Sequence, residues 1–502
     1  MRYPALNTNL SKRWSWLVVS AIATCLLIVP RGLAQEGAAE TDQDQQKKAA
    51  KGPLVIPTPK ASELGLDFPE GVKPKRETDE SLLYTPPSGK PVVVKLHSTA
   101  GKKQLVKFPS GKLKLVDSSK TKPTTKPFVA ATAAEMAQAM REEGFDKYKI
   151  VEADPYVFVY ACSEAFYMHT RSILESLYPG IMESLKAWEL NPKDPETPLV
   201  VIITPNRKSF DTYQKMPEGV AAYYSPVTHY IVLYEDTDLA FAAPEFGLKQ
   251  GAYTIAHEGV HQILAATGIQ ERMGRWPMWI SEGLPEYFCP LKVSSRLVRT
   301  GTAELPERTL KWQRAGTVND LRMWDLLQTP TSEEGDVVKT VVSAQGLTAR
   351  GYSLAWGLTH YLATRKKKEF QAYLQDVRKI EAFDTAWDNR GHAPDPLFVK
   401  HFGDQFSVTE YAVAAHLTDK KMQSQYKDPF EYQTHYIVKR ILKKGRSFDT
   451  VMVITTSPEA ARKWKEEEEA KLAAADEKAR FYTIICETRN KAEYQIRKVM
   501  SR

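Results

Sequence analysis

The stretch His257-Glu258-Gly259-Val260-His261 decides how this sequence is interpreted. It lies in a segment, about residues 248–267, whose pattern predicts a helix, and on a helix the positions i and i+4 share one face. The two imidazoles can therefore converge on one point and bind a zinc ion, while Glu258 lies beside them and can reach a water at the metal. Two surface histidines that flank a glutamate on an amphipathic helix are the alternative interpretation of the pentad.

A second segment offers a third ligand. It reads Trp279-Ile280-Ser281-Glu282-Gly283-Leu284-Pro285-Glu286-Tyr287-Phe288. Three protein ligands with one position left open for water are the catalytic form of a zinc site, whereas structural sites are closed. The expected metal ligands are therefore His257, His261 and Glu282, with one Zn²⁺ per chain. Only 10 of the 502 residues are histidine, so the pentad is uncommon by chance in a chain of this length. The correctly spaced acidic ligand is a second, independent requirement of a zinc site, and this chain meets it as well.

The pentad and the segment W-P-M-W-I-S-E-G-L-P-E-Y-F together resemble the motifs of the gluzincin (thermolysin-like) zinc metallopeptidases. More narrowly, they resemble the peptidase MA-like proteins and a related uncharacterised bacterial family, and the resemblance covers about residues 150–380. It implies an α+β fold with a catalytic lobe formed by a small sheet and the metal helix. The composition becomes that of a globular domain at about residue 128 and the pattern becomes mainly helical after residue 290, so we expect this lobe at 128–290 and a mainly helical lobe at 291–456. The resemblance also implies that the last strand before the metal helix, Tyr230 to Tyr234, is the sheet edge on which an extended peptide pairs.

The resemblance implies roles for further side chains. Glu258 takes a proton from the water and later delivers it to the leaving amine. Glu286, four residues after the third ligand, accepts a hydrogen bond from a ligand histidine; aspartate is more frequent at this position, and an ordinary surface charge is the alternative. Tyr352 is the first candidate for the donor to the oxyanion and His360 is the second, although each can instead be a packed helix residue.

The N-terminal region is typical of an exported protein. Three basic residues lie before or at the start of an apolar run at 14–30, and Gly32-Leu33-Ala34 supplies small residues at a cleavage site. The sequence therefore predicts a signal peptide at 1–34, cleaved near Ala34, and a protein of the periplasm, cell envelope or extracellular space. A retained membrane anchor is the alternative, and no other stretch is long and apolar enough to cross a bilayer.

Removal of the signal peptide leaves three cysteines, Cys162, Cys289 and Cys486. An exported chain with an odd number of cysteines has at least one free or intermolecular thiol. One disulfide is possible, and the sequence does not select the pair. Because they show no C-x-x-C spacing, we interpret all three as structural or buried rather than as metal ligands.

The remaining segments differ in composition. Residues 35–87 are polar and predict a flexible linker. Residues 88–127 contain ten lysines and one acidic residue, Asp117, and predict either a solvated basic arm or a small β-module that docks on an anionic envelope polymer or lipid headgroup. Nucleic acid is not an expected partner of an exported chain. Residues 457–502 predict a charged helical tail with Ser457 as its N-cap.

These features predict an exported zinc-dependent peptidase with a peptide or protein substrate, in which Glu258 activates a zinc-bound water for amide hydrolysis. One alternative is an inactive exported binding or scaffold protein with the same fold, and another is a zinc hydrolase that acts on a non-peptide amide. The presence of Glu258 disfavours the inactive scaffold, because a site without turnover can lose its base and keep its metal.

Overall fold

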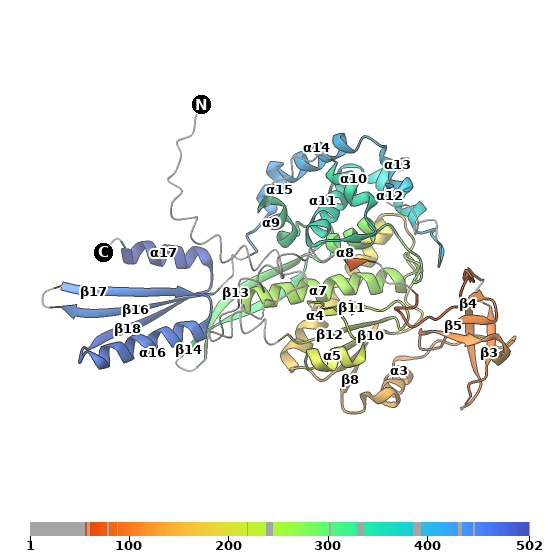
Figure 1. Ribbon diagram of the computed structural model, residues 1–502, viewed down its shortest axis with the longest axis horizontal. Helices are drawn as coiled ribbons and strands as arrows, with labels where there is room; N and C mark the ends of the chain where they lie inside the picture. The colour runs from red at the N-terminus through yellow and green to blue at the C-terminus, as the bar shows by residue number, and fades with distance from the viewer. Residues whose placement is uncertain are drawn as a thin grey trace.

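The chain folds into four parts that follow one another along the sequence (Figure 1). The computed structural model describes residues 56–57, 61–77, 80–87, 89–217, 219–236, 244–300, 303–328, 336–384, 393–429, 434–444 and 447–500. The expected signal peptide and the first part of the expected linker lie outside the described residues. Helices and several sheets are mixed within the described ranges, which confirms the α+β class. No helix among the described residues is long and apolar enough to cross a membrane.

A five-stranded sheet forms the centre of the molecule. Its strands are β8 (Lys149–Ala153), β9 (Tyr156–Tyr160), β10 (Leu199–Thr204), β11 (Ala222–Tyr224) and β12 (Tyr230–Tyr234), in the order β11-β12-β10-β9-β8. The three inner strands are parallel and the two edge strands are antiparallel to their neighbours. Every residue of β10 is buried, as expected for a parallel strand that is covered on both faces.

Helices cover both faces of this sheet. The helices α4 (Glu164–Ala187) and α7 (Pro244–Ala266) lie on one face, where alternate strand residues join the main hydrophobic core. The shorter helices α3 (Ala133–Met140) and α5 (Arg207–Tyr213) lie on the other face, over the remaining strand residues. The metal helix α7 is thus held directly against the sheet by continuous apolar packing.

The predicted edge strand is wrong. The strand β12 (Tyr230–Tyr234) pairs with β10 on one side and with β11 on the other, so β11 is the edge. The chain turns tightly through residues 225–229, where His229 has a positive φ of 66°, and this turn folds β11 back onto the free side of β12. The side of β12 on which β11 pairs depends on the packing of the whole sheet.

A helical lobe covers the end of α7 that carries the pentad. It contains α8 (Met278–Phe288), α9 (Asp320–Gln328), α10 (Val337–Ser343), α11 (Ala349–Arg365), α12 (Lys367–Val377), α13 (Pro396–Phe402), α14 (Phe406–Leu417) and α15 (Lys420–Gln425). The expected helical lobe at 291–456 is not helical throughout, because it begins with a two-stranded ribbon, β13 (Leu291–Thr300) and β14 (Ala303–Trp312), and ends in strands. Trp312 anchors the ribbon by donating its indole N–H to the carbonyl of Phe288 at 2.7 Å.

Residues 61–127 form a β-module that packs against the lobe built on the five-stranded sheet. The strands are β2 (Lys75–Arg76), β3 (Ser81–Tyr84), β4 (Val92–Ala100), β5 (Lys103–Lys107), β6 (Leu113–Asp117) and β7 (Thr121–Pro123). The prediction of a flexible linker at 35–87 is therefore wrong for β2 and β3; in β3, Leu82 and Tyr84 alternate into the core of the module. Leu66, Leu105 and Leu113 form a second core with Met273 and Ala382 of the following lobes, so 88–127 is folded and docked.

An upstream strand reaches the helical lobe. The short strand β1 (Ile56–Pro57) pairs antiparallel with β15 (Gly346–Leu347), which directly precedes α11.

The C-terminal residues form a separate unit with a three-stranded sheet. Its elements are β16 (His435–Lys444), β17 (Ser447–Thr455), α16 (Pro458–Ala474), β18 (Ala479–Cys486) and α17 (Arg489–Met500), with the strand order β17-β16-β18. The helices lie on opposite sides of the sheet (Figure 1). The predicted helical tail at 457–502 is thus wrong, because β18 lies between the two helices and completes a sheet that starts near residue 435. Ser457 is the N-cap of α16, as predicted.

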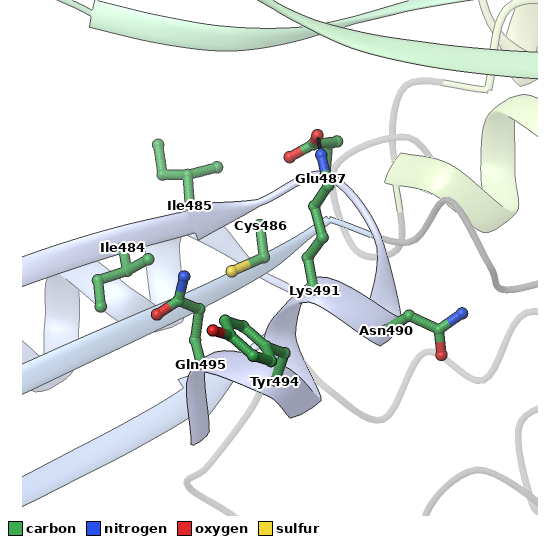
Figure 2. Close-up of a pocket in the computed structure, with 8 residues that line it drawn as sticks. All are labelled: Ile484, Ile485, Cys486, Glu487, Asn490, Lys491, Tyr494 and Gln495. Carbon is green, nitrogen blue, oxygen red and sulfur yellow. Dashed lines mark hydrogen bonds and ion pairs between the residues drawn. The ribbon is translucent and has the colours of Figure 1, made fainter. Parts of the chain in front are cut away.

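An open pocket lies where α17 packs beside the end of β18 (Figure 2). Its lining includes Ile484, Cys486, Tyr494 and Gln495, all from the C-terminal unit.

The three expected cysteines form no disulfide. Cys486 is buried in the C-terminal unit, Cys289 is buried at the end of α8, and Cys162 is half-buried after β9.

Candidate metal centre

The helix α7 places the two histidines of the pentad on one face. The Nε2 atoms of His257 and His261 lie 3.2 Å apart. Gly259 faces the opposite way, toward α4, where a Cβ would come within 2.5 Å of Leu174. The absence of a side chain at Gly259 therefore lets α4 pack closely against α7. The helix α7 ends before Gly268, whose φ of +70° suits glycine.

The helix α8 brings Glu282 to the same point. The Oε2 atom of Glu282 lies 3.1 Å from His257 Nε2 and 3.6 Å from His261 Nε2. These residues are the one group of three possible metal-ligating side chains found within the described part of the chain. Their side chains keep 12–15% of their accessible surface, so a metal ion held by them remains within reach of a small molecule.

The side chain of Glu258 lies between the helix α7 and the edge strand of the sheet. Its Oε2 accepts the backbone N–H of Tyr224, in β11, at 2.8 Å. Burial raises the pKa of Glu258, and the charges of the neighbouring histidines offset part of this effect. A carboxylate that is anchored beside the three candidate ligands, with its pKa above the ordinary value, is suited to accept and release a proton.

Glu286 is buried and supports the first histidine. Its Oε1 lies 3.0 Å from His257 Nδ1, so this nitrogen donates to the carboxylate and the lone pair of Nε2 is available for a metal ion at the point where the three ligand atoms converge. The ordinary surface charge, which was the alternative, does not apply, because the Glu286 side chain is only 4% exposed. The four-residue spacing on α8 thus puts one glutamate on each nitrogen of the His257 ring.

Two residues that the sequence analysis missed hold Glu286 in place. Arg322, in α9, donates from Nε to Oε2 at 2.8 Å and from Nη2 to Oε1 at 2.5 Å. Asn319 donates from Nδ2 to Oε2 at 2.9 Å. Burial alone would raise the pKa of Glu286, but the charge and hydrogen bonds of Arg322, together with His257, outweigh it and lower this pKa to about 2. The carboxylate therefore stays ionised.

The two candidate oxyanion donors have different surroundings. The ring centroid of Tyr352 lies 6.2 Å from that of His257, and burial, followed by the charge of Glu282, keeps the pKa of its phenol well above the ordinary value. The phenol of Tyr352 therefore stays protonated, and its ring lies beside the candidate ligands. His360 is a packed helix residue, because its Nδ1 pairs with His416 at 2.9 Å and its Nε2 with the Gly316 carbonyl at 3.1 Å.

The buried charges of the site favour a dication. Three carboxylates, those of Glu258, Glu282 and Glu286, face a single guanidinium, that of Arg322, which leaves two negative charges if the histidines are neutral. Burial would lower the pKa of His257. The hydrogen bonds that its ring makes with Glu282 and Glu286, and the negative charges of these two residues, outweigh burial and raise this pKa to about 10. Positive charge is therefore strongly stabilised between these ligands, and a divalent metal ion would supply it.

Comparison with known proteins gives one match, over part of the chain, to a family model, and no activity. Residues 251–384 match the family described as "Protein of unknown function (DUF1570)". The matched span includes the pentad, α8, Arg322 and Tyr352, so the whole candidate site except the Tyr224 N–H lies within it. A search of curated proteins finds no match.

Proposed function

We propose that the protein is an exported zinc-dependent peptidase of the gluzincin type. The observation that carries the proposal is the convergence of His257, His261 and Glu282, with Glu258 anchored on the neighbouring strand. A metal-ligating triad without a base would equally suit a structural or transport site. The base beside the triad favours hydrolysis.

The spacing of the three ligand atoms supports zinc as the metal. Zinc binds imidazole nitrogen and carboxylate oxygen at about 2.0–2.2 Å with tetrahedral geometry, which requires ligand atoms about 3.3–3.5 Å apart. The three separations are 3.1, 3.2 and 3.6 Å, so each lies within about 0.2 Å of that range. Two imidazoles, one carboxylate and an open fourth position are the donor set of a catalytic zinc site.

Three residues of the chain, Glu258, Glu286 and Tyr352, have separate roles in the proposed hydrolysis. A bound zinc ion would supply a Lewis acid that polarises an amide carbonyl and acidifies a water. Glu258 accepts the proton of the attacking water at Oε1, while Oε2 stays hydrogen-bonded to the Tyr224 N–H. It then returns the proton to the leaving amine. Glu286 keeps the His257 ring oriented, and the Tyr352 phenol donates to the oxygen on which negative charge develops.

The edge strand supports a peptide as the substrate. The strand β11 (Ala222–Tyr224) ends the sheet directly above α7, and one of its N–H groups already contacts the base. An extended peptide that added to this edge would carry a backbone amide toward the three ligands. The apolar run and cleavage pattern in residues 1–34 support export. The exposed lysines of the β-module would then suit an anionic envelope surface.

Replacement of the base tests the proposed chemistry. Glu258→Gln keeps an oxygen that accepts the Tyr224 N–H, so we expect the fold and about one zinc equivalent per chain to persist. The amide cannot accept the water's proton, so cleavage of a peptide library should fall by at least about 10²–10⁴-fold. Near wild-type turnover would exclude the role of Glu258.

Replacement of a ligand tests the metal. His261→Ala should lose the zinc that elemental analysis finds in the wild-type protein. The matched control is His401→Ala, which removes a histidine that pairs with Asp376 in the helical lobe. Full zinc retention in His261→Ala would exclude this site. A wild-type protein that binds zinc but cleaves no amide would favour the inactive binding protein.

A further inference from the structure

Glu286 lacks the geometric restraint that a shorter side chain would provide. A glutamate has one more rotatable bond than an aspartate, so its carboxylate can turn away from His257 unless other groups hold it. The structure contains such groups, because both oxygens of Glu286 accept hydrogen bonds from α9 or from the residue before it. Their arrangement determines which oxygen faces the metal ligand.

Arg322 holds the carboxylate plane by a two-pronged contact. Its Nε contacts Oε2 at 2.8 Å and its Nη2 contacts Oε1 at 2.5 Å, which is the planar fork that guanidinium groups form with carboxylates. The Oε1 atom that receives Nη2 is also the atom that accepts His257 Nδ1 at 3.0 Å. The position of that oxygen, and with it the direction of the His257 ring, therefore depends on the fork.

Asn319 links this contact to the start of a helix. Its Oδ1 accepts the backbone N–H of Arg322 at 3.2 Å, which is the N-cap interaction, and its Nδ2 donates to Glu286 Oε2 at 2.9 Å. The first turn of α9 thus presents Asn319 and Arg322 to Glu286 as one rigid group.

The same guanidinium also contacts Tyr352. Its central carbon lies 5.3 Å from the centroid of the Tyr352 ring, within the range of a cation–π contact. One side chain therefore touches both the glutamate that supports a metal ligand and the candidate oxyanion donor.

We propose that Arg322 is a positioning residue: it fixes Glu286 in the orientation that holds His257 toward the metal, and it places the ring of Tyr352 beside the ligands. The inference rests on the proposed function, because it concerns the geometry of the same zinc site. A purely structural ion pair is the alternative. It would contribute to folding stability without any specific effect on metal binding.

The decisive variant is Arg322→Lys, which keeps a positive charge beside Glu286 but removes the planar fork. We expect zinc affinity, measured by competition with a chromogenic chelator, to fall about 10- to 100-fold, as is typical when a residue behind a metal ligand is changed. The cobalt(II)-substituted variant should show an altered visible spectrum, because the spectrum reports the geometry of the ligands. A zinc affinity and a cobalt spectrum equal to those of the wild type would overturn the proposal.

The matched control is Arg440→Lys, in the C-terminal unit. Arg440 is similarly buried, with 13% of its side chain exposed against 10% for Arg322, and it also contacts carboxylates, those of Glu468 and Asp449. This control should bind zinc as the wild type does. If both variants lose zinc affinity to the same extent, general destabilisation is the cause and Arg322 has no positioning role.

Two further measurements keep the proposal testable. If Arg322→Lys does not fold, Asn319→Ala removes the hydrogen bonds that Asn319 donates to Oε2 and to the backbone carbonyl of Glu286, together with its cap on the Arg322 N–H. It should weaken zinc binding in the same direction, and unchanged affinity would count against the proposal. In turnover assays, Arg322→Lys should lower kcat less in a Tyr352→Phe background than in the wild type, and an equal loss in both would remove Tyr352 from the proposal. A wild-type protein that binds no zinc would instead refute the proposed function, and this inference with it.

Discussion

Replacement of Gly283 by alanine should displace Glu282 and weaken metal binding. Gly283 follows the ligand on α8 and lies against α11. A Cβ at this position would come within 2.2 Å of the Thr359 hydroxyl oxygen and 3.0 Å of the Ala355 carbonyl oxygen. Thr359 has two common χ1 rotamers in a helix, so its hydroxyl can move away only by adopting the other one. The Ala355 carbonyl belongs to the backbone and can move only if α11 moves.

The size of the effect follows from these distances. Nonbonded heavy atoms separate to about 3.5 Å, so α8 and α11 must move apart by several tenths of an ångström even if Thr359 rotates away. Overpacking of this kind costs about 1–3 kcal/mol, which lowers the Tm of a domain of this size by about 2–12 °C. Ligand distances must hold within about 0.2 Å, so the displaced Glu282 should reduce zinc affinity by at least about tenfold.

Chelator competition and thermal denaturation measure the two effects. Gly251→Ala is the matched control, because this glycine lies in the interior of α7 and its Cβ would meet nothing within 4 Å. It should raise stability by about 0.5–1 kcal/mol and leave zinc affinity unchanged. Thr359→Ala combined with Gly283→Ala should restore part of the affinity, because it removes the closest contact. If Gly283→Ala alone binds zinc like the wild type, the close approach of α8 and α11 does not position Glu282.

Two further predictions concern acid and metal removal. Burial would raise the pKa of Glu271, but its hydrogen bond with His97 and the nearby arginines lower it to about 2, so its contribution to stability is present above pH 4.5 and is lost as the pH falls toward 2. Glu271→Gln should therefore lower stability at neutral pH by about 1.5–3 kcal/mol and flatten the denaturation profile below pH 4.5; an unchanged profile would contradict this. Zinc at 100 times its dissociation constant should stabilise the chelator-treated protein by about 2.7 kcal/mol, measured as a rise in Tm, and a similar rise in His261→Ala would show that zinc binds elsewhere.

The ligand geometry was accessible from the sequence because it depends on local periodicity. His257 and His261 converge for the same reason that any i and i+4 pair converges on a helix. Glu282 required only that a second helix should carry an acidic residue near the first, and the neighbouring motif indicated one. Ser457 was predicted as an N-cap on similarly local grounds, and it caps α16.

The sequence analysis was wrong or incomplete where contacts between distant segments determine strand pairing or the partner of a buried charge. The sequence of β12 (Tyr230–Tyr234) does not predict that β11 pairs with its outer side and makes it an inner strand. The charged tail contains a good helix, but β18 (Ala479–Cys486) acquires its partners about 45 residues upstream, at β16. A buried glutamate at 286 requires a cation nearby, yet the chain has 69 lysines and arginines, and no local pattern marks Arg322 as the partner.

The contacts of His257 explain why the position of α8 has to be restrained from two sides. Glu282 contacts Nε2 at 3.1 Å and Glu286 contacts Nδ1 at 3.0 Å, and both come from adjacent turns of α8. The two nitrogens lie on opposite sides of one rigid ring, so a slide of α8 that shortens one contact lengthens the other. Both contacts are satisfied at a single position of the helix. The close approach at Gly283 limits the distance of α8 from α11, and the fork of Arg322 limits its slide along α7, so the two restraints act on different displacements of the same helix.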